Sequence, residues 1–378
     1  MNGFLKIALV SPYDFASYGG ANDHIRRLAS QFRLWGHNVR IIAPCSAPGS
    51  IEDDDFTPMG RPVPFPSRGS IARVSLSPWM RPRVKELLDR WPQDVIHLHE
   101  PFAGFVTANL ISLSQTVNIA TFHAYPGSRI YDIGGKQLAM PYFKKLHGRI
   151  AVSKPARDYI KRYFPGEYEI IPNGIQVDDF AEAEPIQNLR DGMINLLFLG
   201  RLEKRKGLKY LMAAFSRLKW NWPNLRLIVV GPGNIDEDSL RVMSERNLHD
   251  VVVVGSVSDQ EKARYYKSAD IYCSPATGGE SFGVVLLEAM ASGTPVVATN
   301  IEGYSGVITN GKNGLLATPM DDKSLADTID ILLRNHDVRA QLVDEGRRTA
   351  ESYRWERVAS RVLTYYEEII EEQTTSRV

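Results

Sequence analysis

Residues 278–290 read GGESFGVVLLEAM, and the fold prediction starts from this stretch. Its glycines allow a bare backbone to approach a ligand closely. The apolar residues that follow have helical spacing, at Phe282, Val285, Leu286, Ala289 and Met290. The N-terminus of a helix presents unpaired N–H groups and a partial positive charge, so it suits an anionic or hydroxyl-rich ligand. We therefore predict a ligand-binding loop that leads directly into a helix.

Two carboxylates, Glu280 and Glu288, flank the first part of this predicted helix. Eight helical residues would separate them by ~12 Å, whereas the acid and base of a glycosidase lie only ~5–9.5 Å apart. The two groups are therefore better placed to hold two parts of a long ligand than to act on one bond. A nucleotide sugar has that length. The alternative is a buried helix start with one capping acid and one surface acid.

The remaining chain has the organisation of two α/β domains. Its 378 residues exceed the size of one comfortable core. Short apolar runs alternate with amphipathic segments, as in parallel sheets with helical crossovers. Strands are predicted at 7–10, 38–43, 95–98, 118–121, 149–152, 195–200, 225–230, 251–255, 271–274 and 295–298. Residues 178–185 are acidic and predicted irregular, so the domain boundary is placed there, and an amphipathic helix is predicted over 355–372.

Composition restricts the class of protein. No apolar run approaches the ~20 residues that cross a bilayer, and the first residues lead into a strand without the features of a signal peptide. Cys45 and Cys273 lie far apart, which predicts free thiols in a reducing cytoplasm and no metal site. Residues 1–175 contain 21 basic and 14 acidic residues, a net charge of +7. This charge favours a membrane surface or a phosphorylated acceptor as the partner of the first half, because no nucleic-acid module accompanies it.

The stretch from Gly279 to Met290 resembles the donor-site signature of the retaining family 4 glycosyltransferases. Further motifs of the same family are Gly19-Gly20, HLHEP (97–101), Phe122-His123, GRIAVS (148–153), IPNG (171–174), Gly200-Arg201 and RKG (205–207). The chain is most similar to the branch that transfers mannose to phosphatidylinositol. The resemblance covers nearly the whole chain and is more specific for the family than for the acceptor.

The resemblance implies the GT-B architecture, an α/β fold with two Rossmann-like domains that face each other across a cleft. Residues 1–175 would bind the acceptor, and a C-terminal helix at about 356–378 would pack back onto them. Residues 176–355 would bind the nucleotide-sugar donor. The expected reaction transfers a hexose, foremost mannose from GDP-mannose, to a membrane lipid or phosphorylated polyol such as phosphatidylinositol, with retention at the anomeric carbon. The departing phosphate oxygen would take the acceptor proton.

Three alternatives remain open on the residues. A transferase of this fold could use UDP-glucose or another UDP-hexose. A sugar-nucleotide 2-epimerase shares the fold, although the sequence offers no further acid–base set around the hexose. A non-catalytic nucleotide-sugar or membrane-binding protein is the third, and the presence of His123, Arg201, Lys206 and Glu280 speaks against it.

Arg201 and Lys206 follow a predicted strand that ends at Gly200, where open α/β sheets bind ligands. A forked guanidinium and a lysine charge can stabilise a leaving diphosphate, and the resemblance assigns both residues to it. The alternative is a solvated basic turn, because Lys204 and Arg205 are neighbours. The resemblance also places the backbone of Gly20 near a donor phosphate, although the glycine could simply form a tight turn.

The resemblance assigns further residues to the donor. Glu280 would bind sugar hydroxyls with the backbone of Ser281, Phe282, Gly283 and Val284. Glu288 would accept hydrogen bonds from both ribose hydroxyls. His123 would contact the hexose near the reacting centre. The base would be held by Val257, Asp259 and Lys262. A carboxylate there matches the N–H edge of guanine and not uracil; the alternative is a solvated loop with a helix cap at Ser258.

The acceptor side shows departures from the family. Tyr13, Asn22, Arg73 and His123 are the candidate acceptor residues, but Asn22 replaces a glutamine, Phe102 an asparagine and Ala124 a threonine. These changes weaken the expectation of inositol as the acceptor head group.

A basic helix near residues 79–90 could contact an anionic membrane. Its candidate contacts are Trp79, Arg81, Arg83 and Lys85, and the alternative is a surface helix without lipid contact. The expected location is the cytoplasm or, peripherally, the inner face of the cell membrane. No metal or cofactor is expected, because the acidic runs 53–55 and 236–238 read as solvated loops and Arg201 and Lys206 can replace a cation.

Overall fold

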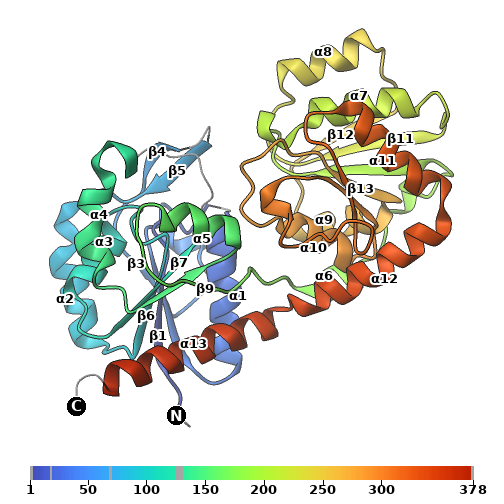
Figure 1. The fold of residues 1–378 in the computed structure, drawn as a ribbon. Coiled ribbons are helices and arrows are strands. Elements are labelled where there is room, and N and C mark those ends of the chain that lie inside the picture. The colour runs from blue at the N-terminus through green and yellow to red at the C-terminus, as the bar shows by residue number, and fades with distance from the viewer. Residues whose placement is uncertain (1–2, 18, 68–69, 124–130, 376–378) are drawn as a thin grey trace. The chain divides into compact units, whose positions relative to one another are not determined.

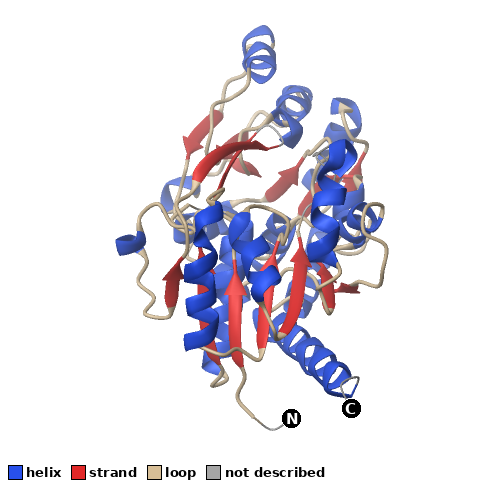
Figure 2. Cartoon of the chain, turned by 90° about the vertical axis from the view of Figure 1, so that its left-hand side faces the viewer, coloured by secondary structure: helices blue, strands red, loops and turns tan. Residues whose placement is uncertain are grey.

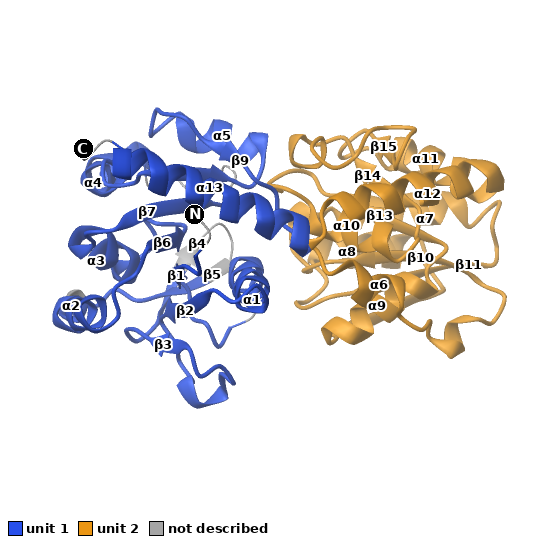
Figure 3. Ribbon diagram, turned by 90° about the horizontal axis from the view of Figure 1, so that it is seen from below, with its two compact units in different colours: residues 1–174, 355–378 blue, residues 175–354 orange. Residues whose placement is uncertain are grey.

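The computed structural model describes residues 3–17, 19–67, 70–123 and 131–375 (Figure 1). It divides the chain into two compact units, coloured separately in Figure 3. Unit 1 consists of residues 1–174 and 355–378, and unit 2 of residues 175–354. The boundaries expected from the sequence differ from these by one residue.

Unit 1 is built on a parallel sheet (Figure 2), and the strand order in this sheet is β3-β2-β1-β6-β7-β8-β9. Its strands are β1 (Lys6–Val10), β2 (Asn38–Ala43), β3 (Phe56–Pro58), β6 (Val95–His99), β7 (Val117–Phe122), β8 (Gly148–Ala151) and β9 (Glu169–Ile170). A separate hairpin joins β4 (Val63–Ser67) to β5 (Ser70–Val74). The direction of winding reverses between β1 and β6. The carboxyl ends of strands at such a switch point are where open α/β sheets bind ligands.

Helices cover both faces of the sheet of unit 1. They are α1 (Gly20–Leu34), α2 (Arg81–Arg90), α3 (Phe105–Leu113), α4 (Lys136–Phe143), α5 (Lys154–Lys161) and α13 (Trp355–Thr375). Helices α1 and α13 share one core, in which Ile25 and Phe32 of α1 are buried with Val362 and Tyr366 of α13. The C-terminal helix therefore belongs to unit 1 although unit 2 precedes it in the chain.

Unit 2 repeats the pattern with a six-stranded parallel sheet in the order β12-β11-β10-β13-β14-β15. Its strands are β10 (Ile194–Leu199), β11 (Leu225–Val230), β12 (Val251–Gly255), β13 (Ile271–Ser274), β14 (Val296–Thr299) and β15 (Leu315–Ala317). Its helices are α6 (Val177–Ala181), α7 (Leu208–Leu218), α8 (Glu237–Glu245), α9 (Asp259–Ser268), α10 (Val284–Ala291), α11 (Asp322–Arg334) and α12 (His336–Ser352). The switch point lies between β10 and β13. The prediction of two Rossmann-like α/β domains is confirmed.

Two local predictions are wrong. Residues 178–185 were predicted irregular, but helix α6 covers their first half, because Val177 and Phe180 lie on one face and are both buried in the core. Residues 236–238 were predicted to lie in a loop. Asp236 instead caps α8 by accepting the Ser239 N–H at 3.2 Å, and the next two acids form the first turn of the helix.

Across the described residues, no helix combines the length and the apolar character needed to span a membrane.

Candidate functional site

Two loops meet at the switch point of unit 2. One follows β10 (residues 200–207) and the other follows β13 (residues 275–283). The Thr277 N–H donates to the Arg205 carbonyl at 2.8 Å and ties the loops together. Gly207 has a positive φ of +72°, and a Cβ there would stand 2.0 Å from the Pro275 carbonyl oxygen. Only glycine permits this approach, which brings the basic turn at 204–206 against the glycine-rich loop.

Glu280 is the centre of this contact. Its Oε1 lies 2.8 Å from the Lys206 ammonium and also accepts from the Arg205 guanidinium. The side chains of Lys206 and Glu280 are only 13% and 12% exposed, so solvent screens their pairing less than that of a surface ion pair. Arg201 lies farther out, is 60% exposed and pairs with Glu203 at 2.9 Å. The structure thus joins Lys206 directly to Glu280, whereas the partner of Arg201 among the described residues is Glu203, which also binds Arg205.

The loop that carries Glu280 ends later than the sequence suggested. Helix α10 begins at Val284, and Gly283 precedes it with a φ of +90°. Glu280 and Phe282 therefore lie before the helix, and the estimate of ~12 Å between the carboxylates, which assumed a continuous helix, does not apply. The backbone of Gly303 packs closely against the same loop. A Cβ at this position would stand 1.9 Å from the Glu280 carbonyl oxygen, so only glycine fits there. Among the described residues no side chain caps α10. The Leu286 N–H donates to the Gly283 carbonyl at 3.0 Å, and the N–H groups before it are available to a ligand.

Glu288 lies inside α10 and is 7% exposed. Lys262 of α9 approaches its Oε1 at 2.8 Å, and the Tyr266 hydroxyl donates to its Oε2 at 3.1 Å. Burial raises the pKa of Tyr266 well above its ordinary value, so this hydroxyl remains a donor. Lys262 also pairs with Asp259 at 3.2 Å. Three residues that the sequence assigned to the nucleoside, Asp259, Lys262 and Glu288, therefore form one connected chain of charges.

Val257 and Ser258 precede α9. Val257 packs against the core of unit 2. Ser258 and Glu261 form a capping box, so the cap predicted at Ser258 is present beside the proposed base site. Asp259 does not cap the helix, and its carboxylate is 56% exposed.

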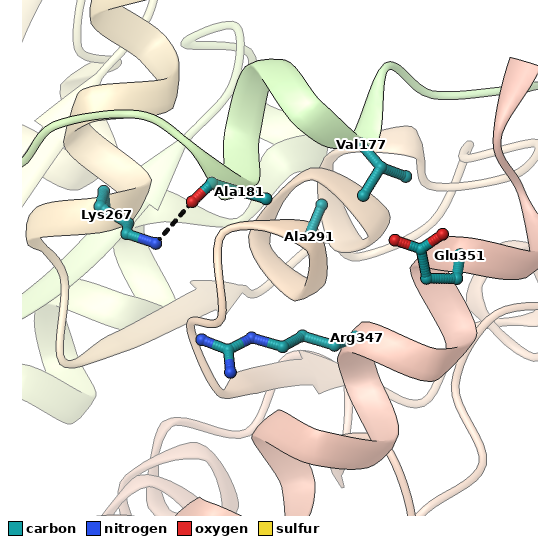
Figure 4. A pocket seen from close by; sticks show the side chains of 6 residues that line it. All are labelled: Val177, Ala181, Lys267, Ala291, Arg347 and Glu351. Carbon is teal, nitrogen blue, oxygen red and sulfur yellow. Dashed lines mark hydrogen bonds between the residues drawn. The ribbon is translucent and has the colours of Figure 1, made fainter.

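A separate pocket in unit 2 has a volume of about 150 Å³ and contains none of the candidate residues (Figure 4). It lies among α6, α9, α10 and α12 and is lined by Val177, Ala181, Lys267, Ala291, Arg347 and Glu351. Lys267 donates to the Ala181 carbonyl at 2.8 Å, as Figure 4 shows. This lysine satisfies a carbonyl at the end of α6, which is a structural task.

Unit 1 gathers histidines from β6, β7 and α1. His123 follows β7, and its Nε2 lies 2.9 Å from Nδ1 of His99 at the end of β6. The ring of His24 stands edge-on to His123 with centroids 5.0 Å apart, and its Nδ1 contacts Asn173 Oδ1 at 2.9 Å. His97 contacts Thr121 at 2.6 Å and Tyr366 of α13 at 2.5 Å.

Burial keeps these four rings neutral. It lowers the pKa of His24 to about 4 and that of His97 to about 3. It lowers the pKa of His99 and of His123 well below the ordinary range, and neighbouring histidines add to the effect. The cluster therefore offers hydrogen-bonding groups and no positive charge at neutral pH.

This burial predicts a stability that depends on pH. His24 stays neutral in the folded chain down to about pH 4 and becomes charged in the unfolded chain below about pH 6.5. The unfolded state therefore binds more protons between these values, so stability is full above pH 6.5 and falls on acidification. For His24 alone the loss at pH 4 is roughly 3 kcal/mol.

Chemical denaturation of wild type and His24→Gln across pH 4–7.5 checks this prediction. The variant is less stable at neutral pH and loses less stability on acidification. His336→Gln, a change of an exposed residue, should follow the wild-type curve. Parallel curves for His24→Gln and wild type would contradict the assignment.

The candidate acceptor residues gather around the loop after β1. Tyr13 bridges to Val74 of β5, and Arg73 approaches the buried Asp14 carboxylate at 3.5 Å while remaining 52% exposed. Asn22 is only 2% exposed. Its amide donates to the Asp14 and Ser17 carbonyls and accepts from the Ser11 hydroxyl. A role of Asn22 in binding the sugar acceptor stays a prediction, and these hydrogen bonds within the protein argue against it.

Two further positions differ from the family, Phe102 and Ala124, and the structure describes only the first of them. Phe102 packs against Phe122 and Phe164, with ring centroids 5.9 and 4.8 Å apart, so it extends the apolar core where the family has a polar group. Ala124 lies outside the described residues.

The candidate membrane residues lie at the start of α2. Trp79 is 87% exposed, and Arg81, Arg83 and Lys85 are exposed as well. The Arg81 guanidinium donates to the Ser112 hydroxyl at 2.8 Å.

Sequence reasoning missed several members of these sites. Arg205 was named in the motif RKG and in the alternative of a solvated turn but was given no role, yet it binds Glu280. Neither the contact of Tyr266 with Glu288 nor that of Asn173 with His24 was predicted. The contact of His99 with His123 was not predicted either. The motif RKG contained a signal for Arg205, while the histidine contacts depend on strand register.

Comparisons with known proteins show similarity along nearly the whole chain. A glycosyltransferase family 4 model matches residues 18–179, and a model of glycosyl transferases group 1 matches residues 179–349. A phosphatidyl-myo-inositol mannosyltransferase of Mycobacterium tuberculosis is 36% identical over 97% of both chains. A D-inositol 3-phosphate glycosyltransferase of Pseudarthrobacter chlorophenolicus is 29% identical over 92% of this chain and 90% of the relative.

Solved structures share the fold. A glycosyltransferase from Rickettsia africae superposes with a TM-score of 0.80 at 19% identity, covering 98% of this chain and 99% of the other. Anabaena HepE in complex with UDP-glucose superposes with a TM-score of 0.73 at 18% identity, covering 98% and 100%.

Proposed function

The chain belongs to glycosyltransferase family 4, and we propose that it transfers mannose from GDP-mannose to a lipid or phosphorylated polyol acceptor such as phosphatidylinositol. The anomeric configuration is retained. The donor proposal is supported by the charges of unit 2. The acceptor proposal is supported by the 36% sequence identity to a phosphatidyl-myo-inositol mannosyltransferase over 97% of the chain.

The observation that carries the proposal is the contact of Lys206 and Arg205 with Glu280 at the switch point. With Arg201 and Glu203, this group contains three cations and two carboxylates, so it keeps a positive charge for an anionic ligand. A diphosphate bound to Lys206 and Arg201 gains charge as the sugar bond breaks. Fixed cations stabilise that charge without reorganisation, which is the largest electrostatic demand of the reaction.

The hexose lies next to this diphosphate in our proposal. Glu280 accepts hydrogen bonds from its hydroxyls, and the open N–H groups at the start of α10 add donors. We assign no protein carboxylate as a nucleophile. The departing phosphate oxygen takes the proton of the acceptor hydroxyl, and the acceptor attacks from the same face of the sugar.

The nucleoside extends from the diphosphate toward α9. Glu288 accepts from the two ribose hydroxyls, which compete with Lys262 and Tyr266 for its oxygens. The exposed carboxylate of Asp259 accepts from the N–H edge of guanine, and Lys262 keeps the local charge balanced. Uracil presents no such edge of two donors, and this favours GDP over UDP.

No divalent cation takes part in the proposed reaction, because Arg201 and Lys206 supply the charge that a metal would supply at the diphosphate. The expected result is full transfer in the presence of EDTA.

The acceptor side uses Tyr13, Arg73 and His123. The half-exposed guanidinium of Arg73 receives an acceptor phosphate. The exposed Trp79, Arg81, Arg83 and Lys85 hold the chain peripherally on the anionic cytoplasmic face of the membrane. The buried amide of Asn22 is left out of this set.

Thermal unfolding with GDP, UDP and ADP tests the donor proposal, because a ligand that binds the folded state stabilises it by mass action. GDP should raise the unfolding midpoint, and GDP-mannose should raise it further. A shift with UDP and none with GDP would reassign the donor to a UDP-hexose. A new nucleotide sugar formed from the donor alone would point to an epimerase.

Gly20 offers a test that separates ligand binding from folding. Gly20 is the first residue of α1, and nothing among the described residues lies within 4 Å of the position of an added Cβ. Neither packing nor backbone requires glycine there, whereas a phosphate on the N–H groups of α1 would.

We expect Gly20→Ala to lower the kcat/KM for transfer by roughly tenfold or more while the unfolding midpoint stays unchanged. Gly49→Ala is the matched control, because its added Cβ also meets nothing within 4 Å. Equal activities of the two variants would remove Gly20 from the donor site.

A further inference from the structure

The contact between His99 and His123 has a direction that the structure can assign. The two rings stack with centroids 5.2 Å apart, and His99 Nδ1 lies 2.9 Å from His123 Nε2. The register of the sheet pairs His99 with Thr121, so the end of β6 stands beside the residues that follow β7. Because both rings are neutral, one of the two facing nitrogens carries the proton and the other accepts it.

The second ring nitrogen of His99 decides which of the two facing nitrogens carries the proton. His99 Nε2 is buried and has no hydrogen-bond partner among the described residues. A buried N–H without an acceptor is rarer and costlier than a buried lone pair without a donor. His99 therefore carries its proton on Nδ1 and donates it to His123 Nε2. A neutral His123 that accepts at Nε2 carries its own proton on Nδ1.

Glu100, which follows His99 in the HLHEP motif, holds the main chain at His123. Glu100 accepts the His123 N–H at 2.6 Å through Oε1. Glu100 itself has a φ of +46°, in the left-handed region that non-glycine residues rarely adopt. Its own N–H donates to the Thr121 carbonyl, and its carbonyl accepts from Ala103. A strained residue that holds a neighbouring backbone fits a role at a functional site.

We propose that His99 is a positioning residue that fixes His123 in the tautomer protonated at Nδ1. Nδ1–H is then the one ring N–H that His123 can donate, either to the neighbouring Asn173 side chain or, with donor bound, to the hexose. The role at the hexose rests on the proposed function, whereas the tautomer does not. His97 provides the contrast within the cluster. Both of its nitrogens already have partners, in Thr121 and Tyr366, and neither partner is His123.

Two isosteres of His99 separate this role from packing. An asparagine places its amide N–H near the position of Nδ1, whereas a glutamine places it near Nε2. His99→Asn should therefore keep the donor to His123, and His99→Gln should remove it. His97→Asn serves as the matched control, because it disturbs the same cluster without touching the contact to His123.

The tautomer is read by ¹H–¹⁵N correlation spectra of the full chain with labelled histidine. The His123 signals are identified by their loss in His123→Gln. We expect the Nδ1–H tautomer of His123 in the wild type, in His99→Asn and in His97→Asn, and the Nε2–H tautomer in His99→Gln. The kcat/KM for transfer should fall about a hundredfold in His99→Gln and stay within about threefold of wild type in His99→Asn.

An Nε2–H tautomer in the wild type would overturn the proposal without recourse to any variant. An unchanged His123 tautomer in a folded His99→Gln would overturn it as well. If the chain transfers no sugar at all, the proposed function fails while the spectra still decide the role of His99.

Discussion

Replacing Lys206 with alanine should lower the rate of sugar transfer about a thousandfold, the range expected when a fixed charge is removed from a developing anion. Lys206 is one of two cations on the Glu280 carboxylate, and its side chain is 13% exposed. The diphosphate would then leave with the help of Arg201 alone. Stability should change little, because Arg205 continues to compensate Glu280.

Lys204→Ala is the matched control for this experiment. Lys204 lies two residues earlier in the same turn, is 74% exposed and pairs with Asp238 at 3.6 Å. It should retain wild-type transfer, since a surface ion pair contributes little to stability and nothing to the diphosphate. The measurement is kcat/KM with GDP-mannose, beside the unfolding midpoint of each variant. Near-normal turnover in a folded Lys206→Ala would remove the residue from the leaving-group site.

Replacing Glu288 with glutamine should weaken GDP binding about a hundredfold. A carboxylate accepts from both ribose hydroxyls, whereas a glutamine carbonyl replaces only one charged oxygen, and losing charge-assisted bonds costs roughly 2–3 kcal/mol. Glu288 is buried, so water does not substitute for the lost contacts. Calorimetric titration of GDP into each variant measures the effect.

The ribose contact has its own control. In the wild type, 2′-deoxy-GDP should bind more weakly than GDP, and Glu288→Gln should largely abolish that difference. Tyr266→Phe removes the hydroxyl beside Glu288 and keeps the carboxylate, so it should preserve the preference for GDP. A preference that persists unchanged in Glu288→Gln would place the ribose elsewhere.

The alternation of strands and helices was readable from the sequence because buried parallel strands are short apolar runs. The strand predicted at 195–200 is β10 at Ile194–Leu199, and that at 225–230 is β11. Helix starts were harder. The apolar spacing of 282–290 includes Phe282 and so predicts that the helix begins there. The backbone turns at Gly283 instead, and Phe282 lies before the helix, where it packs against Tyr353.

The contacts of the sites depend on geometry that the sequence does not encode locally. Residues 204–206 are all cations, and the turn at Gly207 determines which of them reach Glu280, because Gly207 packs against the Pro275 carbonyl. Arg205 therefore joined the site unexpectedly, while Arg201 stayed farther out. The histidine cluster joins two strands, a helix and Asn173 from distant parts of the chain, so only the sheet register reveals it.

The product formed from GDP-mannose labelled with ¹³C at C1 decides most directly whether the chain is a retaining mannosyltransferase. The full chain is incubated with this donor and phosphatidylinositol vesicles in EDTA, and the lipid is analysed by NMR. We expect a labelled mannosyl lipid that keeps the anomeric configuration of the donor and that Lys206→Ala does not form. An inverted product, or a folded wild-type chain that moves no sugar from GDP-mannose, would contradict it.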